Sequence, residues 1–164
     1  MIKMLRLDER LIHGQIAIKW SRHLSVDRII VANDEAAGNA LIQKSLMMAA
    51  PPTCKTAIKS VDEAVVLLND PRCEPLKILI IVSQIADVQK IIDQVKGIPV
   101  IQVGNYGRLV PKLVDQQRET FAPNLYAYPY EVDAFMKLIA SGIECIYQTT
   151  PEDAPVSLKN ALHR

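Results

Sequence analysis

Cysteine and aromatic residues are scarce in this sequence. The 164 residues include three cysteines, Cys54, Cys73 and Cys145, which lie far apart and form no CxxC pair. A disulfide framework or a zinc site needs more numerous or more closely spaced partners, so we expect a structural role for all three. Aromatic residues make up only 5% of the chain. Because they are not interleaved with basic residues, they do not suggest a single-strand nucleic-acid surface.

An excess of charge of either sign is also absent. Lys plus Arg number 19 and Asp plus Glu number 18, which gives a formal net charge of +1. Such a chain has no global field to hold nucleic acid or an anionic membrane. We therefore expect no nucleic-acid partner, and any site for an anion must be built locally.

Long hydrophobic runs are missing as well. The longest purely aliphatic run covers residues 78–82, whereas a membrane span needs about 20 apolar residues. Near the N-terminus, four charged residues come before any apolar segment of a signal peptide could form: Arg6, Asp8, Glu9 and Arg10. The sequence thus predicts a cytosolic protein that reaches a membrane only through a partner.

What the sequence does contain is an alternation of strand-like and helix-like segments. The cleanest local signal is Ser60 with Glu63, which have the spacing of a capping box. Ser83 is a candidate cap for the helix that follows it. Expected strands are residues 2–7, 28–32, 54–58, 76–82, 99–103 and 143–147, with a short one near 119–127. Expected helices are residues 14–23, residues 35–49, one after Ser60, one between Ser83 and Gly97, one from Pro129 to Gly142, and residues 157–163.

This alternation predicts an α/β fold. We expect a single doubly wound domain over residues 1–164, with a mostly parallel central sheet of about six to seven strands and helices on both faces. In open parallel sheets, ligands bind beyond the carboxyl ends of the strands. Polar residues gather in the segments that follow the expected strands: 8–15, 33–35, Ser83 and 104–108.

The segment after the first strand, RLDERLIHGQ at residues 6–15, has the strongest chemical signal. A helix N-terminus offers free N–H groups and the positive end of the macrodipole, which suit an anion. Gly14 lets the backbone approach closely, and Arg10 adds a planar donor fork for phosphate oxygens. His13 can act as a nucleophile near neutral pH. The segment therefore suits a phosphorylated histidine, or acid–base catalysis on a phosphate.

Spacing alone favours a plainer interpretation, since a lone histidine is more often structural or merely exposed. His23 and His163 fit that interpretation far better than His13 does. No set of His, Asp and Glu residues has metal-ligand spacing, and the chain has neither a Walker A nor a GxGxxG motif. The GNYG at residues 104–107 is too weak to imply a nucleotide. We expect no metal and no cofactor.

The RxDxRxxHGQ pattern at residues 6–15, followed by Trp20, resembles a known family. It is similar to the IIB component of the mannose/fructose/sorbose family of the bacterial phosphoenolpyruvate-dependent sugar phosphotransferase system. The resemblance covers nearly the whole chain in order, and the least similar parts are residues 106–118 and Ser83. Its other segments are IIVANDEAA (29–37), MMAAPP (47–52), KTAIKSVDEA (55–64), IQVGN (101–105) and GIECIYQTTPEDAP (142–155).

The resemblance implies a specific function. A IIB component of this family accepts a phosphoryl group from a histidine of IIA, on Nδ1 of one of its own histidines. It then passes the group to a sugar held by the membrane subunits IIC and IID. The motif places the acceptor at His13 and the arginine that helps hold the phosphoryl group at Arg10. The chain would thus be a protein-histidine–sugar phosphotransferase, cytoplasmic and attached to the membrane peripherally through IIC and IID. The sugar stays open, and a homo-oligomer is possible.

Other residues are assigned supporting roles. A phosphoryl group needs N–H and cationic donors, which the backbone at Gly14 and Gln15 can supply. Asp8 and Asp34 carry the wrong sign to touch a phosphate, so we expect them to orient His13 or an arginine, or to form surface salt bridges. Expected minor donors are Ser83 and Asn105. Expected docking residues are Arg6, at a sheet edge, and Arg108.

Two rival functions come from other classes. The first is a non-catalytic regulatory homologue, against which the intact His13 and Arg10 argue. The second is a small α/β enzyme that acts on a phosphorylated metabolite with His13 as its acid–base group. That enzyme would need a deep pocket and a second titratable group facing His13, for which Asp34 is a candidate.

Overall fold

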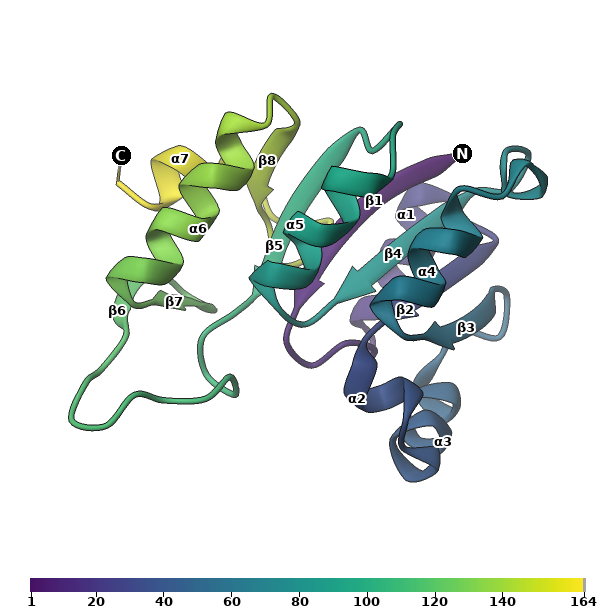
Figure 1. Ribbon diagram of the computed structural model, residues 1–164, viewed down its shortest axis with the longest axis horizontal. Coiled ribbons are helices and arrows are strands. Elements are labelled where there is room, and N and C mark those ends of the chain that lie inside the picture. The colour runs from purple at the N-terminus through teal and green to yellow at the C-terminus, as the bar shows by residue number, and fades with distance from the viewer. Residues whose placement is uncertain (164) are drawn as a thin grey trace.

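Seven strands form a central sheet in the computed structural model, which describes residues 1–163. Neighbouring strands are parallel except for β8 and β9, which are antiparallel. The expected α/β fold with a mostly parallel sheet is thus confirmed (Figure 1). In spatial order the strands are β3 (Lys55–Lys59), β2 (Arg28–Ala32), β4 (Ile78–Val82), β1 (Ile2–Asp8), β5 (Val100–Asn105), β8 (Glu144–Tyr147) and β9 (Val156–Ser157).

Helices cover both faces of this sheet, because its central strands bury side chains on both sides. β4 is buried along its whole length. Ile78, Ile80 and Val82 belong to one apolar cluster, and Leu79 and Ile81 to the cluster on the opposite face. One face is covered by α1 (Ile16–Leu24), α2 (Asp34–Ala37) and α3 (Ala40–Ala49). The other is covered by α4 (Val61–Leu68), α5 (Ile85–Gln94), α6 (Pro129–Ala140) and α7 (Leu158–Ala161).

The single helix expected at residues 35–49 is two helices, because turn-forming residues lie in its middle. Gly38 ends α2. The side chain of Asn39 then accepts hydrogen bonds from the N–H groups of Leu41 (3.0 Å) and Ile42 (3.1 Å). These bonds begin α3 in a new direction.

The two expected helix caps have different outcomes. Ser60 and Glu63 form the capping box, so that prediction is confirmed. Ser83 is not a cap, since α5 begins after Gln84 without a side-chain cap. Instead, Oγ of Ser83 accepts a hydrogen bond from Nδ2 of Asn33 (2.8 Å), which joins the ends of β4 and β2.

The C-terminal third contains more strands than expected. Where one short strand was predicted near residues 119–127, β6 (Glu119–Ala122) and β7 (Leu125–Ala127) form an antiparallel hairpin apart from the central sheet. The strand predicted at residues 143–147 is followed in the chain by one more strand, β9, which pairs with it in the antiparallel direction.

Residues 107–118, here called the arm, connect β5 to β6 without forming a helix or a strand. Figure 1 shows the arm and α3 projecting from the same edge of the sheet, beyond the carboxyl ends of β1 and β4, with the loop after β1 between them. This edge is where an open parallel sheet binds ligands. Across residues 1–163, the helices are too short or too polar to cross a membrane.

Candidate functional site

β1 ends at Asp8 in the middle of the sheet, and the loop that follows brings His13 back to that carboxylate. The side chain of Asp8 is buried, whereas that of His13 is 26% exposed. Nε2 of His13 lies 3.1 Å from Oδ2 of Asp8. Because a carboxylate only accepts hydrogen bonds, Nε2 carries the proton and donates it. In the neutral imidazole Nδ1 is then the nitrogen without a proton, and its lone pair is available for reaction.

Asp8 is itself held in place from several sides. Nη2 of Arg6 donates to Oδ2 of Asp8 (3.2 Å), and the backbone N–H of Arg10 donates to Oδ1 (3.1 Å). The N–H of Leu11 donates to the Asp8 carbonyl oxygen (2.9 Å). The carboxylate thus has a fixed orientation, and it fixes the orientation of the imidazole in turn.

The prediction that Arg6 is a sheet-edge or docking residue is wrong, because β1 is a central strand. Arg6 is only 2% exposed. Nη1 donates to Oε1 of Gln102 and to the carbonyl of Gln148 (3.2 Å), and Nη2 donates to the carbonyl of Thr149 (3.1 Å). Burial lowers the pKa of the Arg6 guanidinium, and the neighbouring Asp8 opposes that shift. Arg6 therefore acts inside the fold, where it positions Asp8.

Gly104 and Trp20 make the space in which this guanidinium lies. A Cβ on Gly104 would lie 2.1 Å from Nη2 of Arg6, so only glycine fits beside it. On the other side, Cζ of Arg6 lies 5.5 Å from the ring centroid of Trp20. The indole Nε1 donates to the carbonyl of Thr149 (3.0 Å). Through Trp20, α1 is attached to the same buried cluster that holds Asp8.

Candidate donors for an anion come from residues just before and just after His13 in the chain. Arg10 is exposed, and its guanidinium has no hydrogen-bond partner within the described chain. α1 begins after Gln15, which is exposed, and the N–H groups of its first turn have no intrahelical acceptors. Gly14 has a φ of +50°, and a Cβ there would meet nothing within 4 Å. The left-handed φ is one that glycine adopts without strain, and the close approach of the Gly14 backbone to an anion stays a prediction.

Asp34 lies away from this site, so the prediction that it orients His13 or an arginine is wrong. It follows β2, and β4 lies between β2 and β1. Two strand spacings, about 10 Å, therefore separate the ends of β2 and β1. Oδ1 of Asp34 accepts the N–H of Val61 at the start of α4 (2.9 Å). Burial raises the pKa of Asp87 to about 6, and the negative charge of the nearby Asp34 contributes to the same shift.

The two expected minor donors differ in their surroundings. Asn105 ends β5 directly beside Asp8, its partner in the parallel register. Its side chain is buried, and Oδ1 has no hydrogen-bond partner among the residues that the structure describes. Ser83 is already bonded to Asn33. Asn105 is therefore the better placed of the two for a group bound at His13.

Glu9 is a site neighbour that sequence reasoning missed. Its carboxylate accepts hydrogen bonds of 2.9–3.2 Å from the backbone N–H groups of Gly107–Val110 in the arm. Arg108, which we expect to take part in docking, is exposed on the arm. Its Nη2 donates a hydrogen bond to the hydroxyl of Tyr126 (2.9 Å). Spacing gave no signal for this contact, because about a hundred residues separate the partners. The arm is thereby tied to the loop that carries His13.

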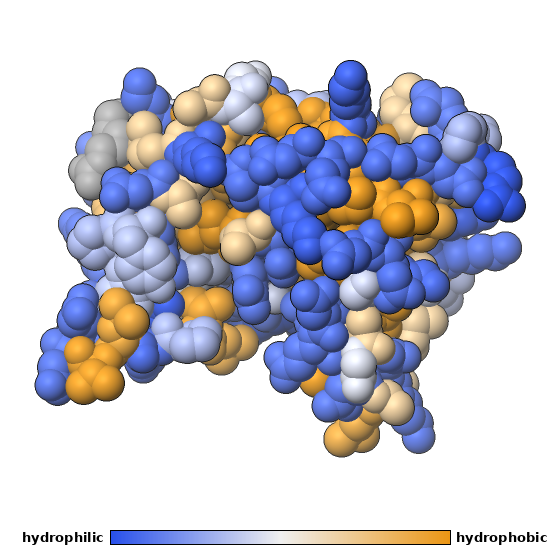
Figure 2. Space-filling model, in the orientation of Figure 1, coloured by the Kyte–Doolittle hydropathy of each residue, from blue (hydrophilic) through white to orange (hydrophobic). Residues whose placement is uncertain are grey.

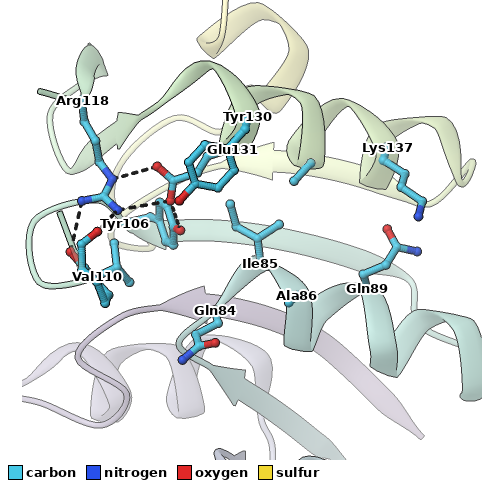
Figure 3. Close-up of a pocket in the computed structure, with 12 residues that line it drawn as sticks. Gln84, Ile85, Ala86, Gln89, Tyr106, Val110, Arg118, Tyr130, Glu131 and Lys137 are labelled. Atoms are coloured by element: carbon cyan, nitrogen blue, oxygen red, sulfur yellow. Dashed lines mark hydrogen bonds and ion pairs between the residues drawn. The ribbon is translucent and has the colours of Figure 1, made fainter. Parts of the chain in front are cut away.

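Three sizeable cavities lie away from His13. One of about 450 Å³ lies between α5 and α6 (Figure 3), one of about 390 Å³ lies beside the arm, and one of about 540 Å³ lies against α1. His13 lines none of these three. His13 itself is open to solvent, with 26% of its side chain exposed.

A partly exposed histidine at the carboxyl edge of a doubly wound sheet, oriented by a buried carboxylate and close in the chain to anion donors, suits a phosphohistidine carrier. The comparisons with known proteins make this class specific. The chain belongs to the family described as the sorbose subfamily IIB component of the phosphotransferase system, whose model matches residues 2–164.

Individual relatives agree with this family. A probable phosphotransferase enzyme IIB component of Streptococcus pyogenes is 34% identical over 164 residues, which cover 99% of this chain and 100% of the relative. The mannose-specific EIIAB component of Escherichia coli is 26% identical over 99% of this chain, which spans only 49% of that protein. The IIBSor domain of the Klebsiella pneumoniae sorbose permease has the same fold. Its TM-score is 0.89 at 23% identity, over 99% of this chain and 96% of that one.

The resemblance seen in the sequence is therefore confirmed, and so is the class of function. IIB components are phosphotransferases of the sugar phosphotransferase system, and this chain is a phosphocarrier of that class.

Proposed function

We propose that His13 carries the phosphoryl group on Nδ1. The observation behind this assignment is the hydrogen bond from Nε2 to Asp8, which leaves Nδ1 as the free nucleophile. The donor in this proposal is a phosphohistidine of IIA, and the acceptor is a hydroxyl of a sugar presented by IIC and IID. The EIIAB name of the Escherichia coli relative supports a IIA partner. The chain would then work at the cytoplasmic face of the membrane, held there through IIC and IID.

The transfer consists of two displacements at phosphorus. The Nδ1 lone pair of His13 bonds to phosphorus while the P–N bond of the donor histidine breaks, and the donor imidazole keeps that electron pair. The ring of His13 then carries both the phosphoryl group and the Nε2 proton, and hence a positive charge. The Asp8 carboxylate stabilises this charge. In the second displacement a sugar oxygen bonds to phosphorus, the hydroxyl proton passes to water, the P–Nδ1 bond breaks, and His13 leaves with that electron pair as neutral imidazole.

The protein's contribution is alignment and neutralisation of charge. Arg10 and the N–H groups at the start of α1 would hold the phosphoryl oxygens between the two displacements. Asn105, beside Asp8 in the sheet, would donate a hydrogen bond from Nδ2 of its side chain to the same group, because phosphoryl oxygens only accept.

Transfer from phospho-IIA tests this function directly. The chain is incubated with phosphoenolpyruvate, the two general phosphocarriers and the cognate IIA. Mass spectrometry at neutral pH then searches for an added phosphoryl group. We expect an acid-labile adduct on the peptide that contains His13. An adduct on another peptide would remove His13 from its role, and no adduct at all would contradict the carrier function.

Arg10→Lys should slow transfer while the fold is kept. Lysine retains the charge but loses the planar fork that grips two phosphoryl oxygens. A loss of about 3 kcal/mol of transition-state stabilisation corresponds to roughly a hundredfold in rate. Single-turnover transfer from phospho-IIA measures the effect. The matched control is Arg22→Lys, an exposed arginine of α1 outside the site. A wild-type rate for Arg10→Ala would show that another residue holds the phosphoryl group.

Arg108→Glu should raise the apparent KM for phospho-IIA. Arg108 is exposed on the arm, and a IIA site built around a phosphohistidine is expected to be locally anionic. Docking should therefore be transient and sensitive to salt. The measurement is the transfer rate from low to high salt, for the wild type and the variant. If neither salt nor the substitution changed the transfer rate, docking would depend on apolar contacts or on another face of the protein.

A further inference from the structure

Exposed apolar side chains gather on the arm and on α3. Within residues 1–163, ten large hydrophobic side chains are exposed, and six of them lie on these two short segments. Exposed hydrophobic residues that occur singly are normal, whereas a concentration of them marks a contact surface. Figure 2 shows apolar tips on both projections. The six residues are Leu41, Met47 and Met48 of α3, and Leu109, Leu113 and Val114 of the arm.

The two projections point in one direction. Both leave the carboxyl edge of the sheet, on either side of the loop that follows β1 (Figure 1). An extended, flat partner would touch both tips together, whereas a small protein surface would have to fit between them. The edge that carries His13 would then face that partner.

The arm is held firmly despite its lack of regular structure. Glu9 accepts four of its backbone N–H groups. On its other side, Arg118 donates to the carbonyls of Val110 (3.1 Å) and Pro111 (2.7 Å) and forms an ion pair with Glu131 (2.8 Å; Figure 3). A segment held in this way loses little conformational entropy when it binds a partner.

Cations accompany the apolar tips. The arm carries Arg108, Lys112 and Arg118 against one acid, Asp115, and Arg118 is paired with Glu131. Helix α3 carries Lys44 and no acid. Lys44 and Lys112 form no ion pair among residues 1–163. Aliphatic side chains flanked by unpaired cations are the chemistry that binds the interface of an anionic bilayer.

We propose that the tips of the arm and α3 contact the anionic lipid surface of the membrane directly. This contact turns the His13 edge toward the subunits that hold the sugar. The orientation rests on the proposed function, but the lipid contact itself needs neither His13 nor a partner protein. Because only two short segments are involved, the binding is weak and reversible, which suits a carrier that must also meet IIA.

Vesicle sedimentation tests the contact with the full chain. Vesicles of phosphatidylglycerol with phosphatidylcholine are compared with vesicles of phosphatidylcholine alone, at low and at high salt. We expect binding to the anionic vesicles that weakens with salt. Lys112→Gln should weaken it about fivefold, the equivalent of one interfacial cation. Val114→Asp and Leu41→Asp should each weaken it about tenfold or more, since an aliphatic contact is replaced by a repelled charge.

Val66→Asp on α4 is the matched control. Val66 is 73% exposed, compared with 85% for Val114 and 76% for Leu41, so all three substitutions should leave the fold intact by circular dichroism. Only the control should bind like the wild type. Three results would overturn the proposal: no binding at low salt, equal binding to both vesicle types, or an equal loss of binding in Val66→Asp. The arm and α3 would then be assigned to contact with a protein partner. If His13 were not phosphorylated while lipid binding was intact, the proposed function alone would fail.

Discussion

His13→Ala is expected to abolish phosphoryl acceptance from phospho-IIA. The reason is chemical: His13 contributes the only imidazole hydrogen-bonded to the buried carboxylate of Asp8, and alanine has no nucleophile. Because His13 is partly exposed and makes one side-chain hydrogen bond, its loss should leave the fold unchanged. Phosphoryl incorporation followed by mass spectrometry at neutral pH measures the effect, and circular dichroism checks the fold.

The other two histidines supply the controls. His23 packs edge-on against Trp20 at 5.5 Å between ring centroids, and His163 packs against Phe121 at 5.8 Å. Both side chains therefore have packing roles. The variants His23→Ala and His163→Ala should accept a phosphoryl group as the wild type does. Full incorporation into His13→Ala would contradict the assignment of the site.

Arg6→Met should destabilise the protein strongly. The substitution leaves the buried Asp8 carboxylate without its cation and removes donors from the carbonyls of Gln148 and Thr149. Breaking a buried ion pair from one side costs about 3–5 kcal/mol. Urea unfolding measures this loss, and we expect phosphoryl acceptance to fall as well, because Asp8 loses its orientation.

Arg22→Met, on the exposed surface of α1, is the control for the loss of one arginine. Its effect should stay within about 0.5 kcal/mol, as for surface substitutions generally. If Arg6→Met unfolded at the same urea concentration as Arg22→Met, Arg6 would not be the residue that anchors the site.

Local sequence patterns were sufficient for the architecture. The alternation of strand-like and helix-like segments predicted the mostly parallel sheet, and Ser60 with Glu63 predicted the start of α4. These features depend on residues that are close in the chain. The split of the expected helix at residues 35–49 into α2 and α3 comes from Gly38 and Asn39, which the prediction did not take into account.

The environment of the site needed the strand order, which periodicity does not give. Arg6 could be recognised as buried only once β1 was known to lie between β4 and β5. Its partners Gln102 and Thr149 are 96 and 143 residues away. In the same way, Asp34 was assigned to His13 because both follow strands, and β4 separates them. The family resemblance pointed to His13 without this information, since its motif is contiguous, and the role of His13 remains a proposal.

The nitrogen that carries the phosphoryl group tests the central claim most directly. The account predicts a bond from phosphorus to Nδ1 of His13, with Nε2 still protonated and bonded to Asp8. Phosphorus and nitrogen NMR of the chain labelled with ¹⁵N at histidine, after transfer from phospho-IIA, distinguishes the two ring nitrogens. Phosphorus coupled to Nδ1 of His13 is the expected result. Phosphorus on Nε2, or on another residue, would contradict the role assigned to Asp8 and to His13.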